Sequence, residues 1–163
     1  STSRRQRQMC IRDSLIGGEV VVKGVNQNGV CWRTGINLPE DDPDGIKNNY
    51  DEIVQLCKKG AIATSGNYRN FYIKDGKKYA HTIDPRTGYP AEQSVLSATI
   101  VANDCMTADA YATAFMAMGL EKARQMADSL PEIEYYVIYA DENGKHQIEY
   151  SKGMLQYLPK RKQ

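Results

Sequence analysis

The sequence predicts an α+β fold, because strand-forming and helix-forming segments are mixed along the chain without a regular strand–helix alternation. Runs of β-branched residues are separated by short turns rich in Asn, Asp and Gly, such as Asn26–Gly29 and Asp141–Gly144. The chain has 163 residues, of which 41% are hydrophobic, and this is enough to build one hydrophobic core. We therefore expect a mixed sheet with hairpins and packed helices.

The first half of the chain is predicted to be mainly strands. In order, we expect a hairpin with strands at 20–25 and 30–36, a breaker-rich loop at 37–45, a helix around Ile53, Val54 and Leu56, a buried strand at 61–64, a tight turn at 65–67, and a second hairpin with strands at 71–73 and 79–80.

The second half is predicted to contain two further helices. After a loop at 81–90, we expect a strand at 95–102, a helix from 108 to 118 capped by Thr107 and ended by Gly119, a helix at 120–130 ended by Pro131, and a last hairpin with strands at 135–139 and 147–150.

The charge balance excludes several classes of protein. The net charge is +1, which gives no electrostatic basis for binding nucleic acid or an anionic membrane surface. No apolar run approaches the ~20 residues of a membrane span, and the Arg-rich start is not followed by the apolar segment of a secretory signal. Residues 1–14 nevertheless carry four Arg and one Asp, a local charge of +3 that sets them apart from the rest.

The four cysteines, Cys10, Cys31, Cys57 and Cys105, show neither CxxC spacing nor clustering with histidine. A zinc site or a redox pair therefore has little support. We expect isolated thiols rather than a disulfide framework, since a chain of this length can build a core without cross-links.

A candidate metal site lies on the predicted helix at 108–118. Asp109 and Thr113 are four residues apart, so a carboxylate and a hydroxyl would lie on one helix face. Such oxygen ligands suit Mg²⁺ or Ca²⁺ rather than zinc, and Mg²⁺ completes its shell with water and phosphate oxygens. We also expect Asp109 in the first turn, where helix N–H groups favour a phosphate. The alternative is structural, with Asp109 stabilising the helix terminus and Thr113 packing.

The loop that follows the second hairpin is a second candidate. His81 is placed to transfer a proton, and Asp84 to orient it or accept a hydrogen bond, with Thr82 and Ile83 between them. Pro85 and Gly88 favour a loop of fixed shape. A structural His beside an Asp is the alternative.

A third candidate is the turn at Ser65-Gly66-Asn67. Its short residues would let backbone N–H groups approach a ligand, with Arg69 available to pair with phosphate. A plain turn fits the same residues.

Taken together, these segments resemble the ApbE family of FAD:protein FMN transferases. The similarity rests on three strings in the same order, Ala63-Thr64-Ser65-Gly66-Asn67-Tyr68-Arg69, His81-Thr82-Ile83-Asp84-Pro85-Arg86-Thr87-Gly88 and Thr107-Ala108-Asp109-Ala110-Tyr111-Ala112-Thr113. It extends from about Leu15 to Leu158, and the second string is the most diagnostic.

The resemblance implies Mg²⁺-dependent transfer of FMN from FAD to a Thr or Ser hydroxyl of an acceptor protein, with release of AMP. It implies Asp109 and Thr113 as metal ligands, His81 and Asp84 as catalytic residues, and a flavin nucleotide site that includes Ser65, Gly66, His81, Thr82 and Ile83. The expected partners are FAD and a flavoprotein subunit of a redox complex. The alternatives are an FAD pyrophosphatase, giving AMP and FMN, and a non-catalytic flavin-binding fragment.

The resemblance also has limits. Members of the family are about twice as long, so residues 15–158 are expected to be the C-terminal half of the domain, truncated at the N-terminus and inactive in isolation. Residues 1–14 fit no part of the family and are expected to be non-native or unstructured, and residues 159–163 form a basic tail. Many relatives are envelope lipoproteins, which implies a periplasmic, membrane-associated location.

Overall fold

A computed structural model describes residues 11–16, 19–39, 49–67, 71–74, 77–80, 82–84, 86–89 and 94–159. The elements in these ranges are β1 (Ile11–Ile16), β2 (Glu19–Gly24), β3 (Trp32–Asn37), β4 (Tyr50–Leu56), β5 (Gly60–Gly66), β6 (Phe71–Lys74), β7 (Lys77–Ala80), β8 (Val95–Ala102), α2 (Cys105–Met118), α3 (Leu120–Asp128), β9 (Glu134–Ala140), β10 (His146–Tyr150) and the 3-10 helix η1 (Lys152–Gln156).

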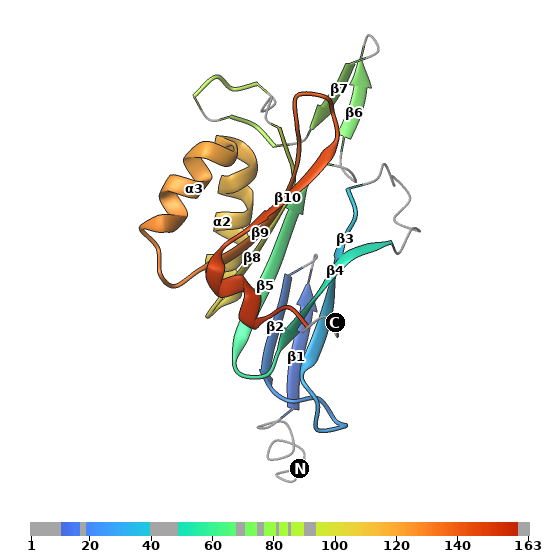
Figure 1. Ribbon diagram of the computed structural model, residues 1–163, viewed down its shortest axis with the longest axis vertical. Helices are drawn as coiled ribbons and strands as arrows, with labels where there is room; N and C mark the ends of the chain where they lie inside the picture. Colours follow the sequence, from blue (N-terminus) through green and yellow to red (C-terminus); the bar gives the residue numbers. More distant parts are fainter. Residues whose placement is uncertain are drawn as a thin grey trace.

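Six strands form one antiparallel sheet in the order β1-β2-β5-β8-β9-β10. Helices α2 and α3 cover one face of this sheet, while the two-stranded ribbon β3–β4 lies on its other side (Figure 1). A second ribbon, β6–β7, extends beyond the end of the sheet at the top of Figure 1. This arrangement confirms the predicted α+β class.

Successive side chains of the central strands pack into two separate hydrophobic cores, one on each face of the sheet. On β5 and β9, Ala61, Ala63 and Val137 face the helices, whereas Ile62 and Ile138 face the ribbon side. The period-two alternation of a strand places successive side chains on opposite faces, so both faces of the sheet must be covered. The ribbon contributes Ile36, Val54 and Leu56 to the second core, and η1 adds Met154.

The helix predicted around residue 53 is a strand. Val54 and Leu56 are buried while Gln55 between them is only half-buried, which is the alternation of β4 and not a helical period. The predicted hairpin at 20–36 is also wrong. The turn forms, with Gly29 at φ 74°, but β2 pairs with β1 and β5, whereas β3 pairs with β4.

The expectation of isolated thiols is wrong for one pair, because Cys31 and Cys57 form a disulfide with their Cα atoms 4.3 Å apart. These residues lie one position beyond the β3–β4 pair Trp32 and Leu56, so the ladder brings them opposite one another. Cys105 is a free thiol, and burial raises its pKa.

The predicted cap of α2 is off by three residues. The helix begins at Cys105, and Asp104 is its N-cap, accepting a hydrogen bond from the backbone N–H of Thr107 at 2.9 Å. Thr107 is therefore inside the first turn. Gly119 ends the helix as predicted, with φ 79°.

The boundary predicted at residue 14 does not match the sheet. Strand β1 begins at Ile11 and pairs along its length with β2, so residues 11–14 belong to the fold. Residues 1–10 and 160–163 lie outside the described ranges.

A charged cluster fastens α3 to the edge strand β10. Arg124 donates from Nε to Glu149 Oε1 at 2.9 Å and from Nη2 to Glu149 Oε2 at 2.5 Å. The Tyr135 hydroxyl donates to Glu149 Oε1 at 3.2 Å. Burial, and then the Glu149 charge, raise the pKa of Tyr135 to about 12.

Candidate functional site

The structure brings the first and third sequence strings into contact. Ser65 lies near the end of β5, which continues through Gly66, so the tight turn predicted at these two residues is instead paired strand. The Ser65 Oγ and Thr113 Oγ1 atoms lie 3.2 Å apart, at hydrogen-bond distance, although 48 residues separate them in sequence.

Small residues make this contact geometrically accessible. Ala108 and Ala112 belong to the buried face of α2, and on the sheet beneath it Ala63 and Ala98 are equally buried. Two alanine surfaces let a helix approach a sheet closely, because neither side places a long side chain between the backbones. The short side chains of Ser65 and Thr113 can then touch.

Asp109 and Thr113 lie one helical turn apart, and both are exposed. Asp109 is the fifth residue of α2, so it is not in the first turn as expected, and the helix terminus contributes less to its surroundings. In the described part of the chain no hydrogen bond engages the Asp109 carboxylate. The pair offers one carboxylate and one hydroxyl oxygen, a donor set that fits Mg²⁺ when phosphate and water supply the other ligands.

The protein side chains alone do not complete a metal site. Among the described residues there is no group of three or more His, Cys, Asp or Glu side chains placed to hold an ion. Any cation on Asp109 and Thr113 would depend on a bound ligand for its remaining contacts.

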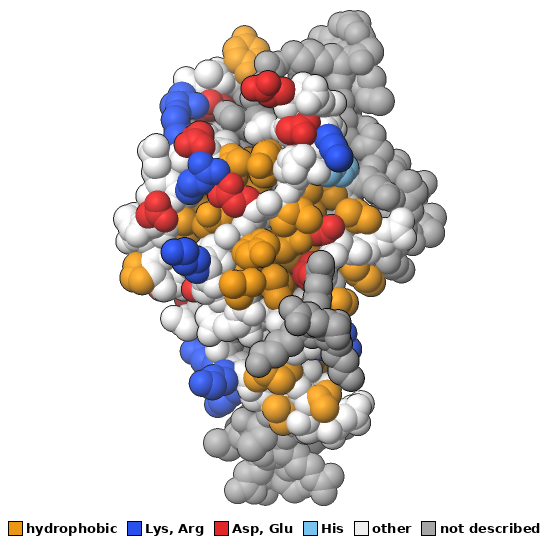
Figure 2. All heavy atoms as spheres, viewed as in Figure 1, with side chains coloured by type: hydrophobic (Ala, Val, Ile, Leu, Met, Phe, Trp, Pro, Cys, Tyr) orange, Lys and Arg blue, Asp and Glu red, His pale blue; other side chains and the backbone are white. Residues whose placement is uncertain are grey.

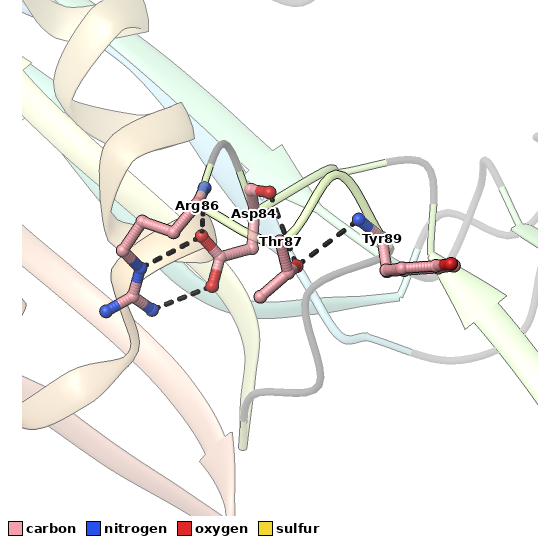
Figure 3. Close-up of polar contacts among 4 residues, drawn as sticks. All are labelled: Asp84, Arg86, Thr87 and Tyr89. Carbon is pink, nitrogen blue, oxygen red and sulfur yellow. Dashed lines mark hydrogen bonds and ion pairs between the residues drawn. The ribbon is translucent and has the colours of Figure 1, made fainter.

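The loop at 82–89 is fixed by Asp84 (Figure 3). Asp84 is only 8% exposed. Its Oδ1 accepts from the Arg86 backbone N–H at 2.9 Å and from Arg86 Nε at 3.0 Å, and its Oδ2 accepts from Nη2 at 2.7 Å. These hydrogen bonds, first from the guanidinium and then from the backbone, lower the pKa of Asp84 to about 2.

The backbone of Asp84 closes the same loop. Its N–H donates to the carbonyl of Tyr89 at 2.9 Å, and its carbonyl accepts from the N–H of Gly88 at 2.8 Å. Gly88 has φ 72°, a conformation that favours glycine. The Tyr89 N–H donates to Thr87 Oγ1 at 3.3 Å, as Figure 3 shows. The predicted loop of fixed shape is thus present.

The structure gives the exposure of some other residues of this loop, whereas His81 is not among the residues that it describes. Ile83 is 48% exposed and Tyr89 is 73% exposed, so the loop presents apolar side chains outward. Thr82 is half-buried. His81 lies outside the described residues, as do Arg69 and Pro85, so the proposed pairing of His81 with Asp84 stays a prediction.

One buried polar residue on the opposite face of the sheet from Ser65 and Thr113 was not singled out from the sequence. Ser97 on β8 is paired in register with Gly66, is 1% exposed, and its hydroxyl has no partner among the described residues. Nearby, Thr64 Oγ1 and Thr99 Oγ1 lie 2.8 Å apart across the β5–β8 ladder. The sequence signal was Ser97 and Thr99, two polar residues alternating within an otherwise apolar strand.

A separate groove lies on the sheet face opposite the helices. It has a volume of about 480 Å³, and hydrophobic side chains gather on this side of the molecule in Figure 2. None of the predicted site residues contributes to it. Its lining residues are Glu52, Tyr136, Ile148, Tyr150, Leu155, Leu158 and Pro159.

No helix in the described ranges is long and apolar enough to cross a membrane.

Comparison with known proteins identifies a single family. The sequence model of the ApbE family matches residues 6–137. The FAD:protein FMN transferase of Vibrio cholerae is 44% identical over 114 residues, covering 70% of this chain and 33% of the relative. The Escherichia coli K12 protein of the same name is 39% identical over 111 residues, covering 68% of this chain and 30% of the relative.

Solved structures give the same result. The flavin transferase ApbE from Vibrio cholerae superposes with a TM-score of 0.76 at 35% identity, covering 96% of this chain and 48% of that one. The ApbE protein of Thermotoga maritima gives a TM-score of 0.75 at 31% identity, covering 92% of this chain and 45% of that one. The chain therefore spans about a third of its curated relatives and just under half of these structures.

Proposed function

The chain belongs to the ApbE family, and on that basis we propose that it carries the catalytic face of an enzyme that transfers FMN from FAD to an acceptor protein. The transfer would depend on Mg²⁺ and would release AMP. The observation that carries the proposal is the contact between Ser65 and Thr113, because it unites two of the three sequence strings on one exposed surface beside Asp109.

The proposed reaction is a displacement at phosphorus. The oxygen of a Thr or Ser hydroxyl on the acceptor protein forms a bond to the phosphorus of the FMN moiety. The bond from that phosphorus to the bridging oxygen of the pyrophosphate breaks, and AMP leaves with the bonding electrons. His81 is the candidate base for the hydroxyl proton.

Residues of this chain would serve the reaction in distinct ways. Asp109 and Thr113 would hold Mg²⁺, which when bound would neutralise charge on the pyrophosphate oxygens. The loop fixed by Asp84 and Arg86 would present Thr82 and Ile83 to the flavin nucleotide, together with the strand end at Ser65. Because Arg86 already engages both oxygens of Asp84, we assign Asp84 to holding the loop in shape rather than to proton transfer.

The acceptor is proposed to be a flavoprotein subunit of a redox complex, and the compartment to be the periplasmic side of the bacterial envelope. The Cys31–Cys57 disulfide supports this location, because disulfides persist in oxidising compartments and are rare in the cytosol.

The proposal is tested in a chimera. Residues 11–158 of this chain, which include the whole of β1, would replace the matching region of the Vibrio cholerae flavin transferase, and the chimera would be incubated with FAD, Mg²⁺ and an acceptor that the Vibrio cholerae protein labels. We expect AMP release together with covalent flavin fluorescence on the acceptor. AMP without a labelled acceptor would indicate a pyrophosphatase instead. A folded chimera that gives neither product would contradict the proposal and favour a non-catalytic flavin-binding segment.

A further inference from the structure

We propose that Ser65 is a positioning residue for Thr113: its hydroxyl accepts the Thr113 proton and so orients the Thr113 oxygen toward a divalent cation. This inference rests on the proposed function, in which Asp109 and Thr113 hold Mg²⁺. The role differs from direct contact with the nucleotide, which the sequence alone suggested for Ser65.

The geometry supports this direction of the hydrogen bond. A hydroxyl has one proton and two lone pairs, so a Thr that binds a cation must direct its proton elsewhere. Ser65 Oγ, at 3.2 Å, is the acceptor that the structure places beside Thr113 Oγ1. With the proton directed at Ser65, the lone pairs of Thr113 remain for a cation on the exposed side of α2.

The strand that carries Ser65 and the helix that carries Thr113 are both held in place by neighbouring elements. Ser65 is held in the β5–β8 ladder opposite Ala98, and α2 is held against that ladder by the buried residues Ala108 and Ala112. The backbones of Ser65 and Thr113 are therefore held at a fixed separation, and each hydroxyl leaves the contact only by rotation about its own χ1. Partners that orient a metal ligand in this way typically change metal affinity by about 10- to 100-fold when they are removed.

Packing explains why the residue at position 65 is small but does not explain why it carries a hydroxyl. Along β5, Ala61 and Ala63 face the helices and are buried in the first core, and Ser65 continues that face where α2 becomes exposed. An alanine there would continue the apolar row, so packing alone does not call for a hydroxyl.

The test is a double-mutant cycle on Mn²⁺ binding by the full 163-residue chain with FAD present in excess, because the phosphate oxygens of FAD supply the contacts that Asp109 and Thr113 do not. Binding is measured by titration calorimetry and by the electron paramagnetic resonance signal of free Mn²⁺, with FAD alone as the blank. The variants are Ser65→Ala, Thr113→Val, the double variant and Ser65→Thr, which restores a hydroxyl. Ser129→Ala, the same chemical change at an exposed position at the end of α3, is the matched control.

We expect Ser65→Ala to weaken Mn²⁺ binding about 10-fold or more in the wild-type background, and to have no further effect in the Thr113→Val background. Ser65→Thr should retain most of the affinity, and Ser129→Ala all of it. Far-UV circular dichroism would confirm that each variant is folded.

The possible failures are distinguishable. If Thr113→Val weakens binding but Ser65→Ala does not, or if Ser65→Ala weakens it equally in both backgrounds, the positioning role is wrong and the metal assignment stands. If the wild-type chain does not bind Mn²⁺, or if Asp109→Ala and Thr113→Val leave its affinity unchanged, the metal assignment fails and the positioning role fails with it.

Discussion

Cys31 and Cys57 are covalently joined across one end of the β3–β4 ribbon, one residue beyond the pair formed by Trp32 and Leu56. The ribbon covers the second core through Ile36 and Val54. The disulfide therefore restrains a part of the fold that is not hydrogen-bonded into the main sheet.

Loss of this disulfide is expected to destabilise the chain substantially. The two cysteines are 26 residues apart, and a cross-link that closes a loop of this size contributes about 3 kcal/mol by restricting the unfolded chain. Cys31→Ser/Cys57→Ser should lower the free energy of unfolding by roughly this amount in urea denaturation. Cys105→Ser is the control and should be close to neutral, and an unchanged double variant would contradict the structural role.

The Asp84–Arg86 pair predicts a specific dependence of stability on pH. Because the pKa of Asp84 is lowered to about 2, its contribution is complete above the ordinary value of about 3.9 and is lost as the pH falls through 2. Asp84→Asn should therefore lower the thermal unfolding midpoint at neutral pH, and its difference from wild type should shrink between about pH 4 and pH 2.

Arg86→Gln provides the control for that experiment. Without its partner, the carboxylate loses the interaction that lowers its pKa, so Arg86→Gln should also lose stability at neutral pH, and adding Asp84→Asn should cost little more. Independent, additive effects of the two substitutions would show that the pair does not act as a unit.

The alanine interface beneath α2 should not tolerate a larger side chain. Ala112 is fully buried against the sheet, so Ala112→Leu should destabilise the protein by about 1–3 kcal/mol through overpacking. Ala110 is exposed on the same helix, and Ala110→Leu should change stability by no more than about 0.5 kcal/mol. Equal effects of the two substitutions in chemical denaturation would contradict the close helix–sheet packing.

The bidentate contact between Arg124 and Glu149 predicts a smaller effect. Glu149→Gln keeps the shape of the side chain but removes the negative charge of the carboxylate to which Arg124 and the Tyr135 hydroxyl both donate hydrogen bonds. Because the Arg124 side chain is 39% exposed, we expect a loss of only about 1 kcal/mol, measured by urea denaturation. Glu142→Gln, in an exposed turn, is the matched control and should be neutral.

The sequence predicted the elements whose signals are local. Strand 95–102, the last hairpin and the stop at Gly119 all appear, because β-branched runs, an Asp-Glu-Asn-Gly turn and a left-handed glycine each act within a few residues. The predicted hairpin at 20–36 was wrong because its two strands pair with other strands. Whether the strand at 19–24 joins the strand at 32–37 or other strands depends on contacts between distant segments, which no local pattern specifies.

The missed disulfide follows from the same cause. A helix around Ile53, Val54 and Leu56 does not place Cys57 opposite Cys31, whereas the β3–β4 ladder does so directly. For the site, the spacing of Asp109 and Thr113 was readable from the sequence because helical periodicity is local. The contact of Thr113 with Ser65 was not readable, since it depends on how α2 crosses the sheet.

If the exposed face of α2 at Asp109 and Thr113 serves flavin transfer, then removal of the Asp109 carboxylate must stop the transfer. Asp109→Ala would be introduced into the chimera with the Vibrio cholerae flavin transferase, and covalent flavin fluorescence on the acceptor protein would be followed over time in Mg²⁺. We predict that the unaltered chimera labels the acceptor and that the folded variant loses at least about 100-fold in rate. Labelling by the variant at the unaltered rate would show that Asp109 has no part in flavin transfer.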